Sequence, residues 1–104
     1  MKIKETHHID SSEPDSNGMF EWCHEYDLYR FEEGDTVLVA RSYSKSPHEA
    51  HFLRLEQAGE AVQIDPADLK SDLAMSARDH LREQGKTEIS WLGDRGYERL
   101  TDAT

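Results

Sequence analysis

Residues 19–31 read MFEWCHEYDLYRF and hold the strongest periodic pattern in the sequence. Large side chains occupy the even positions from Phe20 to Leu28, whereas Glu21, Glu25 and Asp27 occupy odd positions. Successive side chains of a β-strand point to opposite faces, so this alternation predicts a half-buried antiparallel strand. We expect the odd positions to form the exposed face, with Tyr29 at its apolar end.

The flanking segments predict a β-meander around this strand. Runs rich in β-branched or alternating residues predict strands at 36–43, 50–56, 61–64, 87–92 and 97–100. Residues 1–9 alternate only faintly, so they form either an edge strand or a frayed end, and we favour the strand. Residues 10–18 lack apolar side chains and end in Asn-Gly, which predicts a polar loop.

One helix is predicted over residues 66–84. Asp65 is a suitable N-cap, and Pro66 suits the first helical position. Apolar residues then recur at a spacing of four, at Leu69, Leu73, Ala77 and Leu81. Gly85 is a typical C-terminal cap. The predicted fold class is α+β, an antiparallel meander of about four to six strands with this helix packed on one face.

Length and composition indicate a small, acidic, soluble protein. The chain has 104 residues and a formal net charge of −10, which fits a single domain over residues 1–104. No apolar run approaches the roughly 18 residues that span a bilayer, and the N-terminus does not resemble a signal peptide. Cys23 is the only cysteine, so no intrachain disulfide can form. These features predict a cytoplasmic protein.

The charge and the missing motifs restrict the function classes. A strongly acidic protein is repelled by nucleic acid and by anionic membranes, so the expected partner is a basic protein. The sequence lacks the glycine-rich phosphate loops, the nucleophile-elbow motif and any Lys/Arg cluster with interleaved aromatics, which argues against a nucleotide-using enzyme and a direct nucleic-acid reader. We expect no cofactor, and a non-enzymatic role is favoured.

The histidines and the cysteine do not predict a catalytic or metal site. His48 and His51 are three residues apart, which on a strand places them on opposite faces. A closed zinc site needs four defined ligands, and no spacing selects them here. Cys23 and His24 also face opposite ways, so they cannot form a nucleophile–base pair.

The leading hypothesis is therefore a small interaction module that binds a basic protein, as acidic inhibitors, immunity proteins and nucleic-acid mimics do. Carboxylates steer a basic partner and aromatic side chains anchor it. The expected binding residues are Glu21, Glu25, Asp27, Tyr29, Arg41, Tyr43, His48 and His51. The last four flank a polar loop that also contains Lys45 and is either a recognition loop or an ordinary hairpin connection.

Two alternatives remain open. The first is a small enzyme or ligand-binding protein with a site between sheet and helix, near Arg41, Tyr43, His51 and His80. The second is a homodimer, formed through an open edge at residues 1–9 or at the strand after Gly85.

Overall fold

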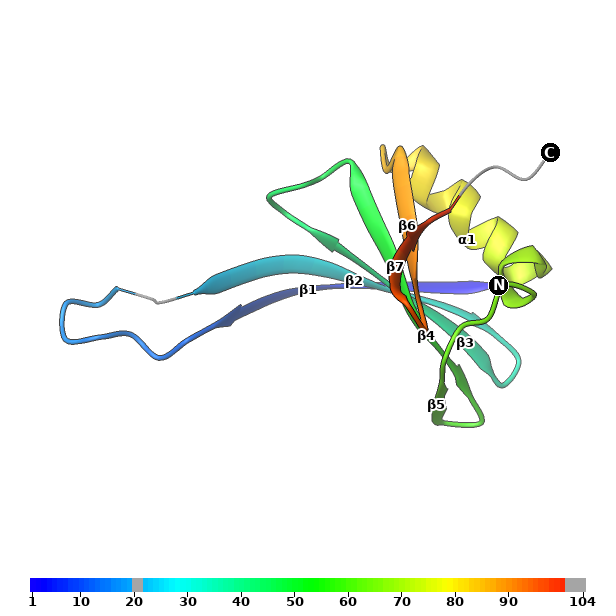
Figure 1. The fold of residues 1–104 in the computed structure, drawn as a ribbon, viewed down its shortest axis with the longest axis horizontal. Helices are drawn as coiled ribbons and strands as arrows, with labels where there is room; N and C mark the ends of the chain where they lie inside the picture. Colours follow the sequence, from blue (N-terminus) through cyan, green and yellow to red (C-terminus); the bar gives the residue numbers. More distant parts are fainter. Residues whose placement is uncertain (20–21, 101–104) are drawn as a thin grey trace.

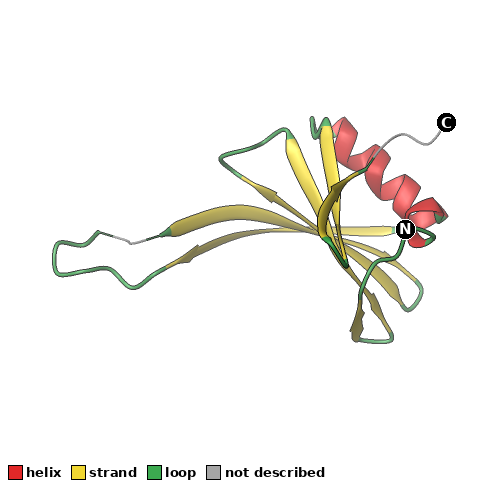
Figure 2. Cartoon of the chain, viewed as in Figure 1, coloured by secondary structure: helices red, strands yellow, loops and turns green. Residues whose placement is uncertain are grey.

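The protein consists of one twisted β-sheet with a helix on one side and a hairpin that reaches far out of the body (Figures 1 and 2). The computed structural model describes residues 1–19 and 22–100. Its principal extents are 51 × 29 × 28 Å, and the hairpin accounts for the long axis. Among these residues, no helix is both long enough and apolar enough to cross a membrane.

The elements follow the order predicted from the sequence. The strands are β1 (Lys2–Ser11), β2 (Cys23–Glu33), β3 (Thr36–Tyr43), β4 (Glu49–Gln57), β5 (Glu60–Val62), β6 (Glu88–Gly93) and β7 (Gly96–Arg99). A 3₁₀ turn η1 (Asp68–Lys70) and the helix α1 (Asp72–Glu83) lie between β5 and β6. The α+β prediction is confirmed, and the sheet has seven strands because residues 2–11 and 96–99 both form strands.

The sheet is a meander with one parallel insertion. Its order is β1-β2-β3-β4-β6-β7, and all neighbours are antiparallel except β4 and β6. Residues 49–52 of β4 pair with residues 88–91 of β6, whereas residues 55–57 pair with β5. β5 and β6 thus pair with different parts of the same side of β4. The connection from β5 to β6 contains η1 and α1.

The core lies between α1 and one face of the sheet, which we call the covered face. On β2, the odd-numbered residues lie on this face, although we expected them to be exposed. Tyr29 and Phe31 are 2% and 0% exposed and stack on each other with ring centroids 6.1 Å apart. The expectation that Tyr29 stands on an exposed face is wrong, because the helix packs over that end of the strand. Burial raises the pKa of the Tyr29 hydroxyl to about 12. The rest of the core is Leu38, Ala40, Ala50, Phe52, Leu55, Ile64, Leu73, Ala74, Ala77, Leu81, Ile89 and Trp91.

The helix starts later than the sequence indicated. Ser71 is the N-cap, since its hydroxyl accepts the Ala74 N–H at 3.1 Å and donates to the Asp68 carbonyl at 2.7 Å. The Asp68 carboxylate accepts the Asp65 N–H at 2.9 Å, and the 3₁₀ turn η1 begins at Asp68. Asp65 therefore does not cap α1. The predicted end is confirmed, because Gly85 follows the helix with a φ of +87°.

The predicted polar loop begins later than residue 10. Asp10 and Ser11 still pair with β2, so the described part of the loop covers 12–19. The Asp15 carboxylate accepts the Asn17 and Met19 N–H groups at 2.8 and 3.0 Å, which closes the turn.

Candidate functional site

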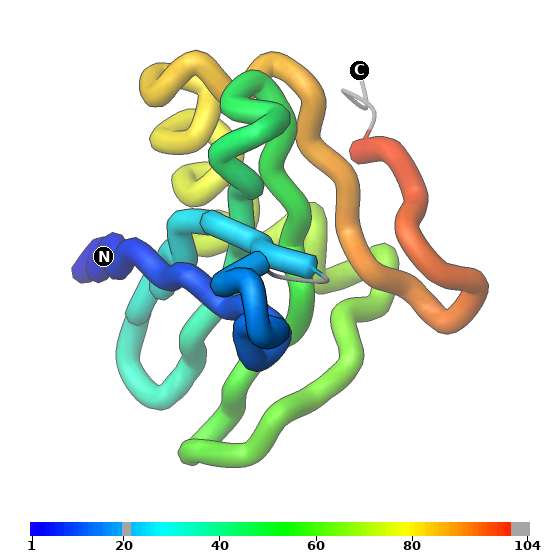
Figure 3. Tube along the Cα trace, turned by 90° about the vertical axis from the view of Figure 1, so that its left-hand side faces the viewer, coloured from blue at the N-terminus to red at the C-terminus, as the bar shows by residue number. Residues whose placement is uncertain are grey.

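The most prominent feature is the outer part of the β1–β2 hairpin, residues 9–25, which we call the arm. It extends to the left in Figure 1 and points toward the viewer in Figure 3. Pairing with β3 starts only at Tyr26, so the arm is a two-stranded ribbon with no third strand beside it in the described structure. Isolated two-stranded hairpins are marginally stable in water, so a protruding ribbon requires side-chain support or a partner.

Three polar contacts support the base of the arm. His7 lies between two carboxylates of β2, with Nδ1 2.6 Å from Asp27 and Nε2 2.6 Å from Glu25. These hydrogen bonds, first to Asp27 and then to Glu25, raise the pKa of the His7 imidazole above its usual 6.5. On the other face, the Tyr26 hydroxyl donates to Asp10 at 2.6 Å. The two predicted binding residues Glu25 and Asp27 therefore lie together and hold the two strands of the hairpin in register.

The hairpin is strongly acidic. Between Lys4 and Arg30 the sequence contains seven Asp or Glu and no Lys or Arg. The structure places six of these carboxylates, and Glu21, which we expected to contribute, lies outside the described residues. The placed residues are Glu5, Asp10, Glu13, Asp15, Glu25 and Asp27. In the sequence, this segment accounts for seven of the ten units of net negative charge, and four of the six placed carboxylates lie on the arm.

The arm also exposes large apolar side chains. Ile9, Met19 and Trp22 are 63%, 65% and 47% exposed. Apolar side chains among carboxylates, held away from the body, are accessible to a partner from several sides. These three residues were not among the predicted site residues, although counting charges between Lys4 and Arg30 would have identified the segment that contains them.

A row of aromatic rings continues from the arm across the sheet face opposite α1, which we call the open face. Trp22 stacks on His24 at 5.6 Å, and His24 contacts Tyr43 at 5.8 Å. The Arg41 guanidinium lies over the Tyr43 ring at 4.7 Å and near the Tyr26 ring at 5.8 Å. Cations are attracted to aromatic faces, so these tyrosines fix the orientation of the Arg41 side chain.

Arg41 connects this row to a second group on the same face. Its Nη2 donates to the Tyr97 hydroxyl at 3.1 Å, and Tyr97 packs against His51 with ring centroids 5.1 Å apart. His51 is hydrogen-bonded to Ser90 of the neighbouring strand β6. Desolvation lowers the pKa of His51, which favours the uncharged ring at neutral pH.

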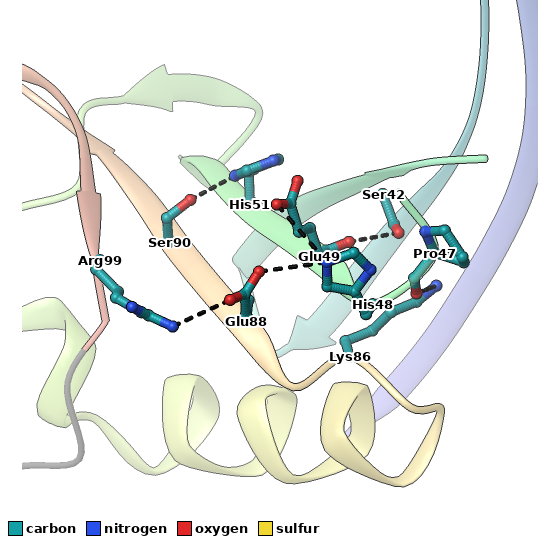
Figure 4. Close-up of polar contacts among 9 residues, drawn as sticks. All are labelled: Ser42, Pro47, His48, Glu49, His51, Lys86, Glu88, Ser90 and Arg99. Carbon is teal, nitrogen blue, oxygen red and sulfur yellow. Dashed lines mark hydrogen bonds and ion pairs between the residues drawn. The ribbon is translucent and has the colours of Figure 1, made fainter. Parts of the chain in front are cut away.

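His48 belongs to an ion-pair cluster at the start of β4 (Figure 4). Its Nε2 lies 3.3 Å from Glu88 and 3.9 Å from Glu49, and Arg99 donates to Glu88 at 3.2 Å. His48, Glu49 and Glu88 each present a ligand atom within 4.8 Å of the others, a spacing that a divalent cation could bridge. However, Glu88 already pairs with Arg99 and the His48 side chain is 56% exposed, so we interpret the cluster as a surface ion-pair network.

Two side chains hold the loop before β4 by donating hydrogen bonds to backbone carbonyls (Figure 4). Buried Lys86 donates its Nζ to the Pro47 carbonyl at 2.7 Å, and the Ser42 hydroxyl donates to the Glu49 carbonyl at 2.6 Å. The loop is thus a structured hairpin connection that is tied to the segment after α1. This favours the simpler of the two interpretations of residues 44–48.

The alternative site between sheet and helix is not formed by the residues expected there. Arg41, Tyr43 and His51 lie on the open face, whereas the His80 ring packs edge-on against Phe31 at 5.8 Å on the covered face. The sheet separates His80 from the other three, and core side chains fill the space between sheet and helix.

Comparison with known proteins does not add a function. No protein-family model matches the chain, and no curated protein or solved structure matches it either. Function must therefore be inferred from the residues and their arrangement.

Proposed function

We propose that this protein is a non-enzymatic interaction module whose acidic arm binds a basic protein surface. The observation that carries the proposal is the concentration of carboxylates and exposed apolar side chains on one projecting hairpin. Carboxylates attract a basic partner over a distance of about a Debye length, roughly 8 Å at physiological salt. Buried aromatic and apolar anchors then supply most of the contact energy.

Trp22 is the best placed anchor. It is half exposed, it stacks on His24, and that stacking limits the freedom which the side chain has to lose on binding. Ile9 and Met19 lie on the same arm and are still more exposed. A basic groove that receives the arm would bury all three side chains while its cations face the surrounding carboxylates.

The test compares matched charge variants of the purified protein as bait in a lysate of its host. The arm variant carries Glu13→Lys and Glu25→Lys, and the control carries Glu60→Lys and Glu83→Lys on the exposed body. Both changes alter the net charge equally. We expect the arm variant to lose a basic protein that the wild type and the control retain, with capture weakening as salt rises.

A third bait, Trp22→Ala, separates anchoring from general charge attraction. It leaves the charge unchanged, and we expect it to lose the same protein. Equal loss with both charge variants, or full retention by Trp22→Ala and the arm variant, would remove the arm as the binding element.

A further inference from the structure

We propose that β1 pairs with the β1 strand of a second copy, antiparallel and centred on Thr6, so that two sheets join into one. This goes beyond the proposed partner binding and does not depend on it. The proposal rests on three observations: β1 is a long open edge, backbone geometry restricts its possible registers, and one of these matches its side chains.

The first observation is the edge itself. In the strand order of the described residues, β1 has β2 on one side and no strand on the other. It spans 10 residues, whereas β7 at the opposite edge spans only 4. Its pairing with β2 is regular over its whole length, so the outer backbone groups form an uninterrupted row. Such rows pair readily with another strand unless something blocks them.

Backbone geometry limits which self-pairings are possible. In an antiparallel ladder, two facing residues either both direct their N–H and C=O groups at each other or both direct them away. Along β1, every second residue directs these groups outward. Outward residues of one copy must therefore face outward residues of the other, and a two-fold axis must pass through a residue, not between two residues.

Centring the pair on Thr6 also matches the side chains. Ile3 then faces Ile9 of the second copy, and these are exposed apolar residues of β1, at 37% and 63%. In the same register Lys2 faces Asp10, and Glu5 faces His7. By symmetry each pair occurs twice. Apolar and opposite-charge pairs directly across a ladder are the ones that stabilise a sheet.

The neighbouring registers are poorer. Centring on Glu5 places the two Glu5 carboxylates directly opposite each other and sets Ile3 against His7. Centring on His7 sets Ile9 against Glu5 and Ile3 against Ser11. The two lysines on this edge disfavour unselective pairing, but Lys2 is compensated when the axis passes through Thr6.

The pairing would place each arm alongside the outer edge of the other copy and so give the two-stranded ribbon a third strand. Because each chain carries a formal charge of −10, the two copies repel, and added salt should strengthen the dimer. Binding of a basic partner should instead weaken with salt. The opposite salt responses keep the two proposals distinguishable.

The experiment places a single cysteine on the expected axis, in a Cys23→Ser background that removes the exposed native thiol. Facing Cα atoms in an antiparallel ladder lie about 4.5–5.5 Å apart, which a disulfide can span. We expect Thr6→Cys to form a cross-linked dimer under mild oxidation. The matched control Lys4→Cys should not, since its two cysteines would be about 13 Å apart.

A mixture of Lys4→Cys and His8→Cys chains should cross-link, because these positions face each other in the same register. Sedimentation of the reduced wild-type protein at low and high salt checks the non-covalent dimer, and Ile9→Lys should weaken it whereas Val62→Lys, also on an exposed strand, should not. A monomer at high salt, or a dimer that Lys4→Cys cross-links as well as Thr6→Cys does, would overturn the proposal.

Discussion

Replacing Ser71 by Ala should destabilise the protein by about 1 kcal/mol, because the substitution removes the N-cap of α1. The Ser71 hydroxyl accepts the Ala74 N–H at 3.1 Å and donates to the Asp68 carbonyl at 2.7 Å, and Ala can do neither. The helix has only 12 residues, too few to be stable alone, so a lost cap weakens its packing on the sheet. For a domain of this size the expected fall in melting temperature is roughly 4–8 °C.

The informative comparison is with Asp65→Ala. Asp65 matches the cap pattern in the sequence, but it lies exposed ahead of the 3₁₀ turn, so its loss should cost less than about 0.5 kcal/mol. Ser71→Asp keeps the acceptor and should retain most of the stability. Urea unfolding followed by circular dichroism measures all three variants. If Asp65→Ala costs as much as Ser71→Ala, the assignment of the helix start is wrong.

Three further predictions concern the core and the pH dependence of stability. Phe52→Ala, at a side chain with 0% exposure, should cost about 3–5 kcal/mol in urea unfolding, and a cost below about 2 kcal/mol would contradict its place in the core. Glu56→Gln should cost about 1 kcal/mol at neutral pH, since the bidentate pair with Arg30 is only partly exposed. That pair lowers the pKa of Glu56 below 4.5, so its contribution is present above that pH and lost as pH falls, and unfolding at neutral and acid pH should show the difference shrink. The contribution of His7 to stability changes with pH in the opposite direction, because its pKa is raised: the contribution is complete below pH 6.5 and is lost as pH rises. His7→Gln should therefore flatten this part of the pH–stability curve. An unchanged curve would refute the hydrogen bonds of His7 with Asp27 and Glu25.

Local patterns predicted the elements because each depends on neighbours in the sequence. The alternation in β2 and the β-branched run of β3 are patterns of consecutive residues, so each strand could be predicted from its own segment. Gly85 likewise ends the helix as expected. The face of β2 that is buried could not be read in this way. Alternation separates two faces but does not say which one a distant helix will cover, and α1 covers the face that contains Tyr29.

The contacts that define the candidate site are between strands. The clasp of His7 by two carboxylates depends on the register between β1 and β2, and the stacking of Arg41 on Tyr43 depends on side-chain packing. Neither contact can be predicted from the pattern within a single stretch of sequence. The acidic character of the hairpin is different, because the seven Asp or Glu between Lys4 and Arg30 are visible in the sequence itself.

The division of one side of β4 between β5 and β6 also bears on how the chain folds. From β1 to β4, each strand pairs with the next one in sequence, so each of these three pairings closes a short loop. The β4–β6 pairing instead has to wait until residues 58–87 have been bridged, and the entropy of closing a long loop must be overcome before any contact compensates it. A chain emerging from the ribosome can therefore assemble the meander while the face with Tyr29 and Phe31 is still uncovered. The interval before α1 and β6 arrive is the stage at which this protein is most exposed to misassembly.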